Sequence, residues 1–221
     1  IQKNIKDILI PSEERKISMF PMDYEEFLWA IGDTTTSRLL ADVFERKIPV
    51  GEAVNRKLMR DFRLYMLVGG MPQAVNAYIE TNNFRKVDEV KRDILKLYED
   101  DFKKIDTSGR ISMLFDAIPA QLNTNASRYQ VSSVLSGERA ETVLGFIADM
   151  VDSRTVQIAY HANDPNVGLA KAKDLRRFKL FLADTGLLAT LIFKDKDFTL
   201  ENFPETIPYG DMSRLTDYAY K

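Results

Sequence analysis

Cysteine is absent from this sequence, and histidine and tryptophan occur once each. Without cysteine the chain has no disulfide, no thiolate metal site and no cysteine nucleophile. The longest apolar run, residues 181–193, is too short to span a bilayer and contains Asp184. No secretory signal peptide is visible after Ile1. These absences fit a protein of the reducing cytoplasm that does not bind a membrane, and we expect that location.

Sequence signatures of catalysis are missing as well. The chain has no G-x-x-x-x-G-K-[ST] phosphate loop, no G-x-S-x-G, no His-Glu-x-x-His and no zinc-type ligand cluster. The single histidine, His161, has no partner for a catalytic triad, and we expect it at the surface. The paired acids Glu25-Glu26 and Asp100-Asp101 lie on charged helix faces, where they solvate the surface. We therefore expect this chain alone to hold no catalytic residue and no metal.

A strong charge of one sign is missing too. The formal net charge is −2, so no global field draws the chain toward nucleic acid or an anionic membrane. Such binding needs a local basic patch, and one candidate lies between residues 171 and 179. It combines the single acid Asp174 with five basic residues: Lys171, Lys173, Arg176, Arg177 and Lys179. On an exposed loop these five side chains are suited to the phosphates of a nucleic acid.

Helical periodicity dominates the first half of the chain. A hydrophobic fraction of 45% and a charged fraction of 29% are typical of a soluble globular protein. Asp23 and Glu26 form the pattern of a capping box for a helix over 22–32, in which we expect Trp29 to lie in the core. Apolar residues recur at helical spacing in three further segments, 36–46, 53–68 and 84–105. The residues of 36–46 expected to point inward are Leu39, Leu40, Val43 and Phe44.

The chain is organised around residues 64–80, LYMLVGGMPQAVNAYIE. Gly69 and Gly70 permit a close turn that a side chain would block, and Pro72 suits the first turn of a helix. We therefore predict a helix, a glycine elbow and a second helix. The backbone N–H groups at the start of the second helix are suited to a phosphate or another polar ligand. An ordinary helix–helix turn explains the same spacing, and both interpretations stay open.

The second half changes character after Ser108-Gly109, a candidate domain boundary. A helix over 111–122, a short helical turn and a helix over 138–152 precede two β-rich runs, 155–160 and 178–184. This order is typical of a winged helix, with 138–152 as the recognition-type helix and 161–177 as the wing. Acids on or beside that helix would repel DNA: Glu138, Glu141, Asp149 and Asp152. Contact with DNA and contact with a protein therefore both remain open.

Several stretches together resemble one family, the AAA-type P-loop ATPases of bacteria and archaea that carry a C-terminal domain of unknown function. MFPMDYEEFLWAIG (19–32) resembles the family's segment after the ATPase core strands, and YMLVGGMPQAVNAYIET (65–81) resembles its lid motif. DILKLYEDDFKKI (93–105) looks like the lid helix that follows. AIPAQL (117–122) and FKLFLADTGLLA (178–189) resemble two later signatures, in the same order and at similar spacing.

This resemblance implies a mostly α fold, in which a helical AAA-type lid precedes a winged-helix-like domain with a small β-ribbon. The implied units are the end of the ATPase core (1–33), the lid (34–106), the winged-helix-like domain (107–193) and a polar tail (194–221). The chain starts at Ile1, not at methionine, so we expect it to be a fragment. The Walker motifs would precede it, and a nuclease-like segment would follow Lys221.

By the same resemblance, Gly69, Gly70, Met71 and Pro72 would lie near the base or ribose of ATP, with Mg²⁺ held elsewhere in the intact protein. The implied function is that of the lid and C-terminal module of an ATP-binding and ATP-hydrolysing protein. The alternative is a nonenzymatic winged-helix adaptor that binds DNA or a protein. One departure from the family pattern weakens a ligand role for 138–152, because Glu138 in LSGERAET (135–142) replaces a small residue.

Overall fold

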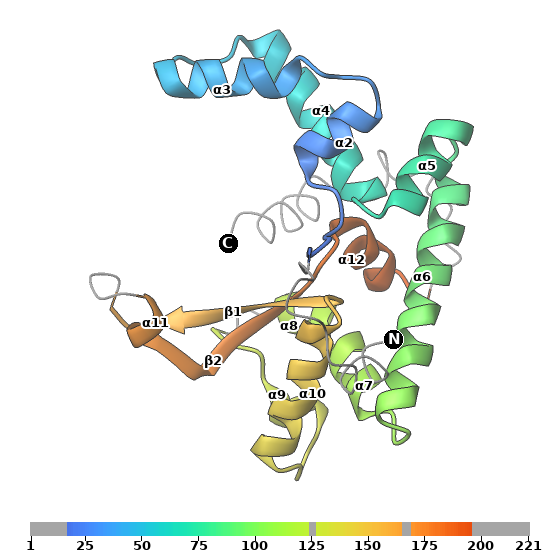
Figure 1. Cartoon of the computed structure of the whole chain (residues 1–221), viewed down its shortest axis with the longest axis vertical. Coiled ribbons are helices and arrows are strands. Elements are labelled where there is room, and N and C mark those ends of the chain that lie inside the picture. Colours follow the sequence, from blue (N-terminus) through green and yellow to red (C-terminus); the bar gives the residue numbers. More distant parts are fainter. Residues whose placement is uncertain (1–16, 124–126, 165–168, 196–221) are drawn as a thin grey trace, which may run out of the picture.

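The computed structural model describes residues 17–123, 127–164 and 169–195, which form helices and one two-stranded ribbon (Figure 1). The helices of the first half are α2 (Tyr24–Ala30), α3 (Thr36–Arg46), α4 (Glu52–Val68), α5 (Pro72–Thr81) and α6 (Phe84–Ile105). The second half adds α7 (Arg110–Asp116), α8 (Ile118–Asn123), α9 (Val131–Val134), α10 (Ala140–Asp152), β1 (Val156–Ala162), α11 (Leu169–Ala172), β2 (Lys173–Leu182) and α12 (Thr185–Ile192). The predicted mostly α fold with a small β-ribbon is confirmed.

Local signals in the sequence account for several helix ends. Asp23 and Glu26 form the predicted capping box, in which each side chain accepts a hydrogen bond from the other residue's backbone N–H, at 2.9 and 3.0 Å. Residues 111–122, predicted as one helix, form α7 and α8. Pro119 has no N–H to continue the ladder of α7, which explains why the helix breaks there.

Two apolar clusters make up the core of the described chain, and α6 takes part in both. The smaller cluster joins α2, α4, α5 and α6 through Phe27, Val68, Ala74, Val75 and Val87. The larger one extends from Ile94 on α6 to Leu191 on α12 and includes buried residues of the ribbon and of α7, α8 and α10. Val90 and Met71 pack against both clusters. The turn at Ser108-Gly109, the candidate domain boundary, therefore joins helices that share one core.

The predicted core position of Trp29 is wrong, because 51% of this side chain is exposed. The helix α2 has only seven residues, and its buried contacts are made by Phe27 and Leu28. Trp29 lies one position further round the helix and points away from them.

The inward positions predicted for Leu39 and Phe44 are wrong as well, since they are 43% and 83% exposed. Leu40 and Val43 are half-buried, and Thr36 is the buried residue of α3. The periodicity correctly gave an amphipathic helix. However, α3 lies at one end of the molecule, away from the ribbon and from α7 to α10, so no described element covers its whole apolar face (Figure 1).

The two strands pair in antiparallel register, and one face of the ribbon packs on the helices. Phe178, Leu180 and Leu182 alternate as the buried residues of β2. The strands are longer than predicted, so the connection between them covers 163–172 rather than the expected wing 161–177. The helices α7, α8, α9 and α10 precede the ribbon, so the predicted order of helices before strands is present, with 111–122 divided into two helices. The winged-helix interpretation of this order stays a prediction.

Candidate functional site

The glycine elbow has the predicted form of a helix, a turn and a second helix. The helix α4 ends at Gly69, which has a φ of 83° and donates its N–H to Tyr65 O at 2.7 Å. Pro72 is the first residue of α5, where the N–H group that proline lacks would have no partner within the helix. Both Gly69 and Gly70 are buried.

Three segments distant in sequence meet at this elbow. Met22 donates its backbone N–H to Gly70 O at 2.8 Å, and Gly70 donates its own N–H to Asp184 Oδ2 at 2.6 Å. Gly186 lies against the end of α4, where a Cβ atom at residue 186 would come within 2.5 Å of Val68 O. A Cβ atom at Gly70 would likewise collide with the backbone of Met22. The sequence motifs GGMP and ADTGLL thus form one joint, which we call the elbow joint: Met22, Gly69, Gly70, Lys91, Asp184 and Gly186.

Asp184 is the buried anion of the elbow joint, with 4% of the residue exposed. Its carboxylate caps α12 by accepting the N–H of Leu187 at 2.7 Å, and it accepts the N–H of Gly70 with its other oxygen. Burial raises the pKa of Asp184, while these N–H groups and the charge of Lys91 act in the opposite direction. One carboxylate therefore accepts the hydrogen bonds of two backbone N–H groups, one at the start of α12 and one at the elbow.

Lys91 is the buried cation of the elbow joint and is only 1% exposed. Its Nζ donates to Leu67 O at 2.8 Å and to Gly186 O at 3.3 Å. Burial lowers the pKa of Lys91 to about 8, although the nearby charges of Asp88 and Asp184 favour the protonated form. Lys91 thus satisfies a carbonyl in the last turn of α4 and places positive charge at the negative end of that helix.

A second polar contact ties α6 to α12 beside the joint. Asp88 accepts hydrogen bonds from Thr190 Oγ1 at 3.2 Å and from Arg92 Nε at 2.7 Å. Arg92 also donates to the carbonyl of Lys194 at 3.0 Å. The position of α12 on α6 is therefore fixed by hydrogen bonds as well as by apolar contacts.

The predicted nucleotide-contacting residues differ in their access to solvent. Gly69 and Gly70 are buried, Met71 is half-buried and Pro72 is exposed. The N–H of Gly70 is bonded to Asp184, so in this conformation it is not free for a ligand. In the described part of the chain no side chain caps the start of α5, and Gln73 in its first turn is exposed. The nucleotide role of these residues stays a prediction.

The five predicted nucleic-acid residues lie together at the outer part of the ribbon. Lys171 belongs to α11, and the other four, Lys173, Arg176, Arg177 and Lys179, belong to β2. Lys173 Nζ lies 3.8 Å from the ring centroid of Tyr160, a cation–π contact. His161 is exposed at the end of β1, as predicted.

An irregularity in the strand register separates these basic residues. Tyr160 is paired with Phe178, but its neighbour His161 is paired with Asp174. Leu175, Arg176 and Arg177 consequently have no partner in β1 and form a bulge in β2. Leu175 is 57% exposed, unlike the buried leucines further along the same strand.

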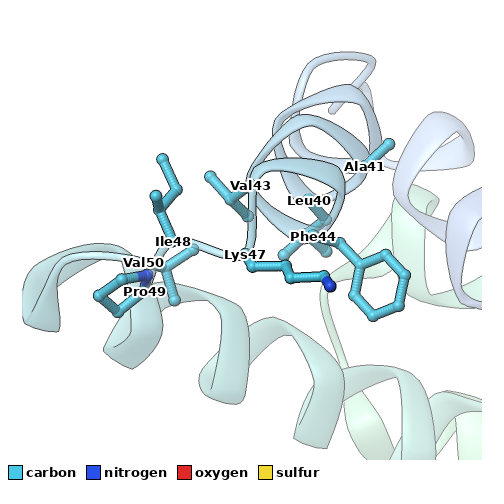
Figure 2. Close-up of a pocket in the computed structure, with 8 residues that line it drawn as sticks. All are labelled: Leu40, Ala41, Val43, Phe44, Lys47, Ile48, Pro49 and Val50. Carbon is cyan, nitrogen blue, oxygen red and sulfur yellow. The ribbon is translucent and has the colours of Figure 1, made fainter.

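An apolar groove of about 740 Å³ is lined by the second half of α3 and by residues 47–50, which follow it (Figure 2). Its walls include Leu40, Phe44 and Ile48, and Lys47 is the charged residue in its lining. Within the residues that the structure describes, no cluster of histidine and carboxylate side chains is suited to a metal ion. No helix in this part of the chain is long and apolar enough to cross a membrane.

Sequence reasoning found the elbow but missed its two buried charges. Lys91 lies four residues after Val87 and so falls on the apolar stripe of α6, and a lysine on such a stripe is the sequence signal of a buried charge. Asp184 precedes the apolar run of α12, as an N-capping residue does. Nothing in the sequence indicated that its second oxygen binds Gly70.

Comparison with protein families shows a match to a family described as "Domain of unknown function (DUF8612)", over residues 59–197. The matched part starts within α4 and includes the elbow joint and the ribbon. No curated protein and no solved structure matched the chain.

Proposed function

The chain belongs to the DUF8612 family, and for this member we propose the role of a helical lid and C-terminal module in an ATP-binding P-loop ATPase. In this proposal the chain performs no chemistry itself. Its elbow lies beside the bound nucleotide, and its ribbon responds to the state of that nucleotide.

One observation carries the proposal, namely the convergence of three motif segments at the elbow joint. Met22, Gly70 and Asp184 belong to three separate stretches that resemble the ATPase family, and backbone N–H groups link them at 2.8 and 2.6 Å. Asp184 follows β2 by two residues. A shift of the elbow would therefore move α12 and the end of the ribbon through direct contacts, with no intervening flexible loop.

The start of α5 is the part of the elbow that a nucleotide can reach. Pro72 and Gln73 are exposed there, while Gly69 and Gly70 are buried and form the turn that precedes the helix. The uncapped first turn and the helix dipole favour negative charge at this position. We therefore expect Met71, Pro72 and Gln73 to contact the nucleotide, with the two glycines acting through the backbone geometry.

The substitution Gln73→Glu tests this placement in protein expressed from the complete reading frame. A carboxylate in the first turn of α5 favours the helix, because it complements the helix dipole, but it repels the phosphates of ATP. We expect ATP affinity, measured with a fluorescent ATP analogue and by calorimetry, to fall about 5- to 10-fold, or about 1 kcal/mol. Thermal stability should be unchanged or slightly higher.

The control is Asn76→Asp, which places the same charge nearly one turn further along α5 at another exposed position. It should change ATP affinity much less. If the two substitutions change ATP affinity equally, the proposal that the elbow contacts the nucleotide is wrong. If the wild-type protein binds no ATP at all, the ATPase proposal fails, and the nonenzymatic adaptor becomes the better explanation.

A further inference from the structure

The outer part of the ribbon is an exposed, basic structure on a chain without net positive charge. Between Val156 and Leu182 the sequence has five basic residues and two acids, whereas the whole chain has a formal charge of −2. One of the two acids, Asp174, accepts the backbone N–H of Arg176 at 2.9 Å. Figure 1 shows that the ribbon projects away from the helices toward α11. The positive charge is therefore concentrated on a thin, accessible arm.

The bulge in β2 gives this arm a specific shape. Three residues, Leu175 to Arg177, are inserted opposite the step between Tyr160 and His161. An insertion of this kind bends the strand, and β2 turns visibly on its way from α11 (Figure 1). The bulge exposes Leu175 directly beside Arg176 and Arg177. Leu175 is therefore an exposed apolar residue that is followed in the sequence of the arm by two arginines.

This combination suits duplex DNA better than a groove in an acidic protein. Arginine side chains bind the phosphates along a groove, and apolar side chains of architectural proteins insert between base pairs in the minor groove. A two-stranded ribbon is also thin enough to follow a groove. The acids Glu141, Asp149 and Asp152 on α10 disfavour entry of that helix into the major groove, so the arm has to act without it.

We infer that the arm binds duplex DNA through the minor groove of the DNA, with Leu175 inserted between two base pairs and Arg176 and Arg177 on the flanking phosphates. Lys171 and Lys179 add backbone contacts on the same arm. The DNA is kinked at the inserted leucine. Flexible steps such as TA within A·T-rich sequence should be preferred, because they unstack at the lowest cost. This role does not depend on ATP binding at the elbow.

The test uses the 221-residue chain and a 20-base-pair A·T-rich duplex with a central TA step, labelled at both ends for energy transfer. Wild-type protein should bind the duplex and shorten its end-to-end distance. Leu175→Ala should abolish the bend and weaken binding about tenfold or more, the loss expected when a leucine no longer leaves water. Its affinity should keep the wild-type salt dependence, since no charge is changed.

The double substitution Arg176→Gln with Arg177→Gln should act differently. It removes two phosphate contacts, so the slope of log affinity against log salt concentration should fall by about 1.8. Matched controls are Leu97→Ala, at a leucine that is 61% exposed on α6, and Arg38→Gln with Arg85→Gln, at two exposed arginines outside the ribbon. Both controls should bind and bend the duplex as wild type does.

Each other outcome overturns the inference. Absence of DNA binding at low salt would remove the DNA role. Tighter binding to polyglutamate than to the duplex would identify an acidic protein as the partner. If the duplex binds without a bend, or if Leu175→Ala leaves the bend unchanged, Leu175 does not insert between base pairs and the arm contacts only the phosphates. Circular dichroism melting of each variant establishes that it is folded.

Discussion

Gly70 and Asp184 are 114 residues apart in the sequence, yet the backbone N–H of the first lies 2.6 Å from a carboxylate oxygen of the second. Both residues are buried. The contact occupies the donor that a glycine elbow at a helix start would otherwise offer to a ligand. It also ties α12 directly to the turn between α4 and α5, in addition to the contacts that α12 and the residues after it make with Lys91, Asp88 and Arg92.

Removal of the carboxylate should therefore be costly. Asp184→Ala leaves the N–H groups of Gly70 and Leu187 buried without a partner, and we expect the free energy of unfolding in urea to fall by about 2–4 kcal/mol. Asp184→Asn keeps an acceptor and should lose less. The control Asp174→Ala removes the acceptor of one N–H group, that of the exposed Arg176, and should cost less than about 1 kcal/mol. Equal losses for Asp184→Ala and Asp174→Ala would contradict the buried role.

The buried Lys91 predicts a stability change in mildly alkaline solution. Its pKa is about 8 in the folded protein against 10.5 for the free side chain, so the unfolded chain binds more protons between these values. Stability should accordingly rise as the pH rises through this window. Between pH 7.5 and 9.5 we expect a gain of about 1–2 kcal/mol in wild type relative to Lys91→Met, measured by urea unfolding. Parallel pH profiles for the two proteins would show that Lys91 titrates normally.

The close approach of Gly186 to the end of α4 is testable with a single methyl group. The Cβ of Gly186→Ala would come within 2.5 Å of Val68 O and 2.6 Å of Gly69 N, which are backbone atoms that cannot rotate away. We expect a loss of about 2–3 kcal/mol in thermal unfolding. Gly145→Ala in α10 is the matched control. It meets no atom within 4 Å, so it should stabilise the helix by up to about 1 kcal/mol.

The single tryptophan reports directly on the exposed end of the molecule. Because 51% of Trp29 is exposed, its fluorescence emission should resemble that of tryptophan in water, and acrylamide should quench it readily. Unfolding in urea should then change the emission maximum only slightly. A strongly blue-shifted emission that resists quenching would show that another part of the protein or a second copy covers α2.

The sequence predicted those features whose causes are local. The capping box of Asp23, the elbow at Gly69-Gly70 and the helix order before the ribbon all follow from short patterns, and all are present. Periodicity also identified α3 as amphipathic. It could not show which side of α3 the rest of the chain covers, because coverage depends on the position of the helix in the fold.

The long-range polar contacts could not be predicted from the sequence, for a similar reason. The pairing of Asp184 with Gly70 depends on how α12 docks, which no local pattern specifies. The bulge at Leu175 was also missed, because a register shift depends on both strands, while each strand alone shows ordinary alternation. The sequence therefore located the basic residues of the arm but not the exposed leucine among them.

The link between Gly70 and Asp184 has a consequence for synthesis of the protein on the ribosome. At about 5–20 residues per second, roughly 6–23 s pass between the translation of these two residues. During that time the elbow has neither its carboxylate nor its α12 neighbour, and Lys91 lacks one of its two carbonyl partners. The nascent first half is then a candidate for chaperone binding, and it can reach its final packing only after α12 has emerged.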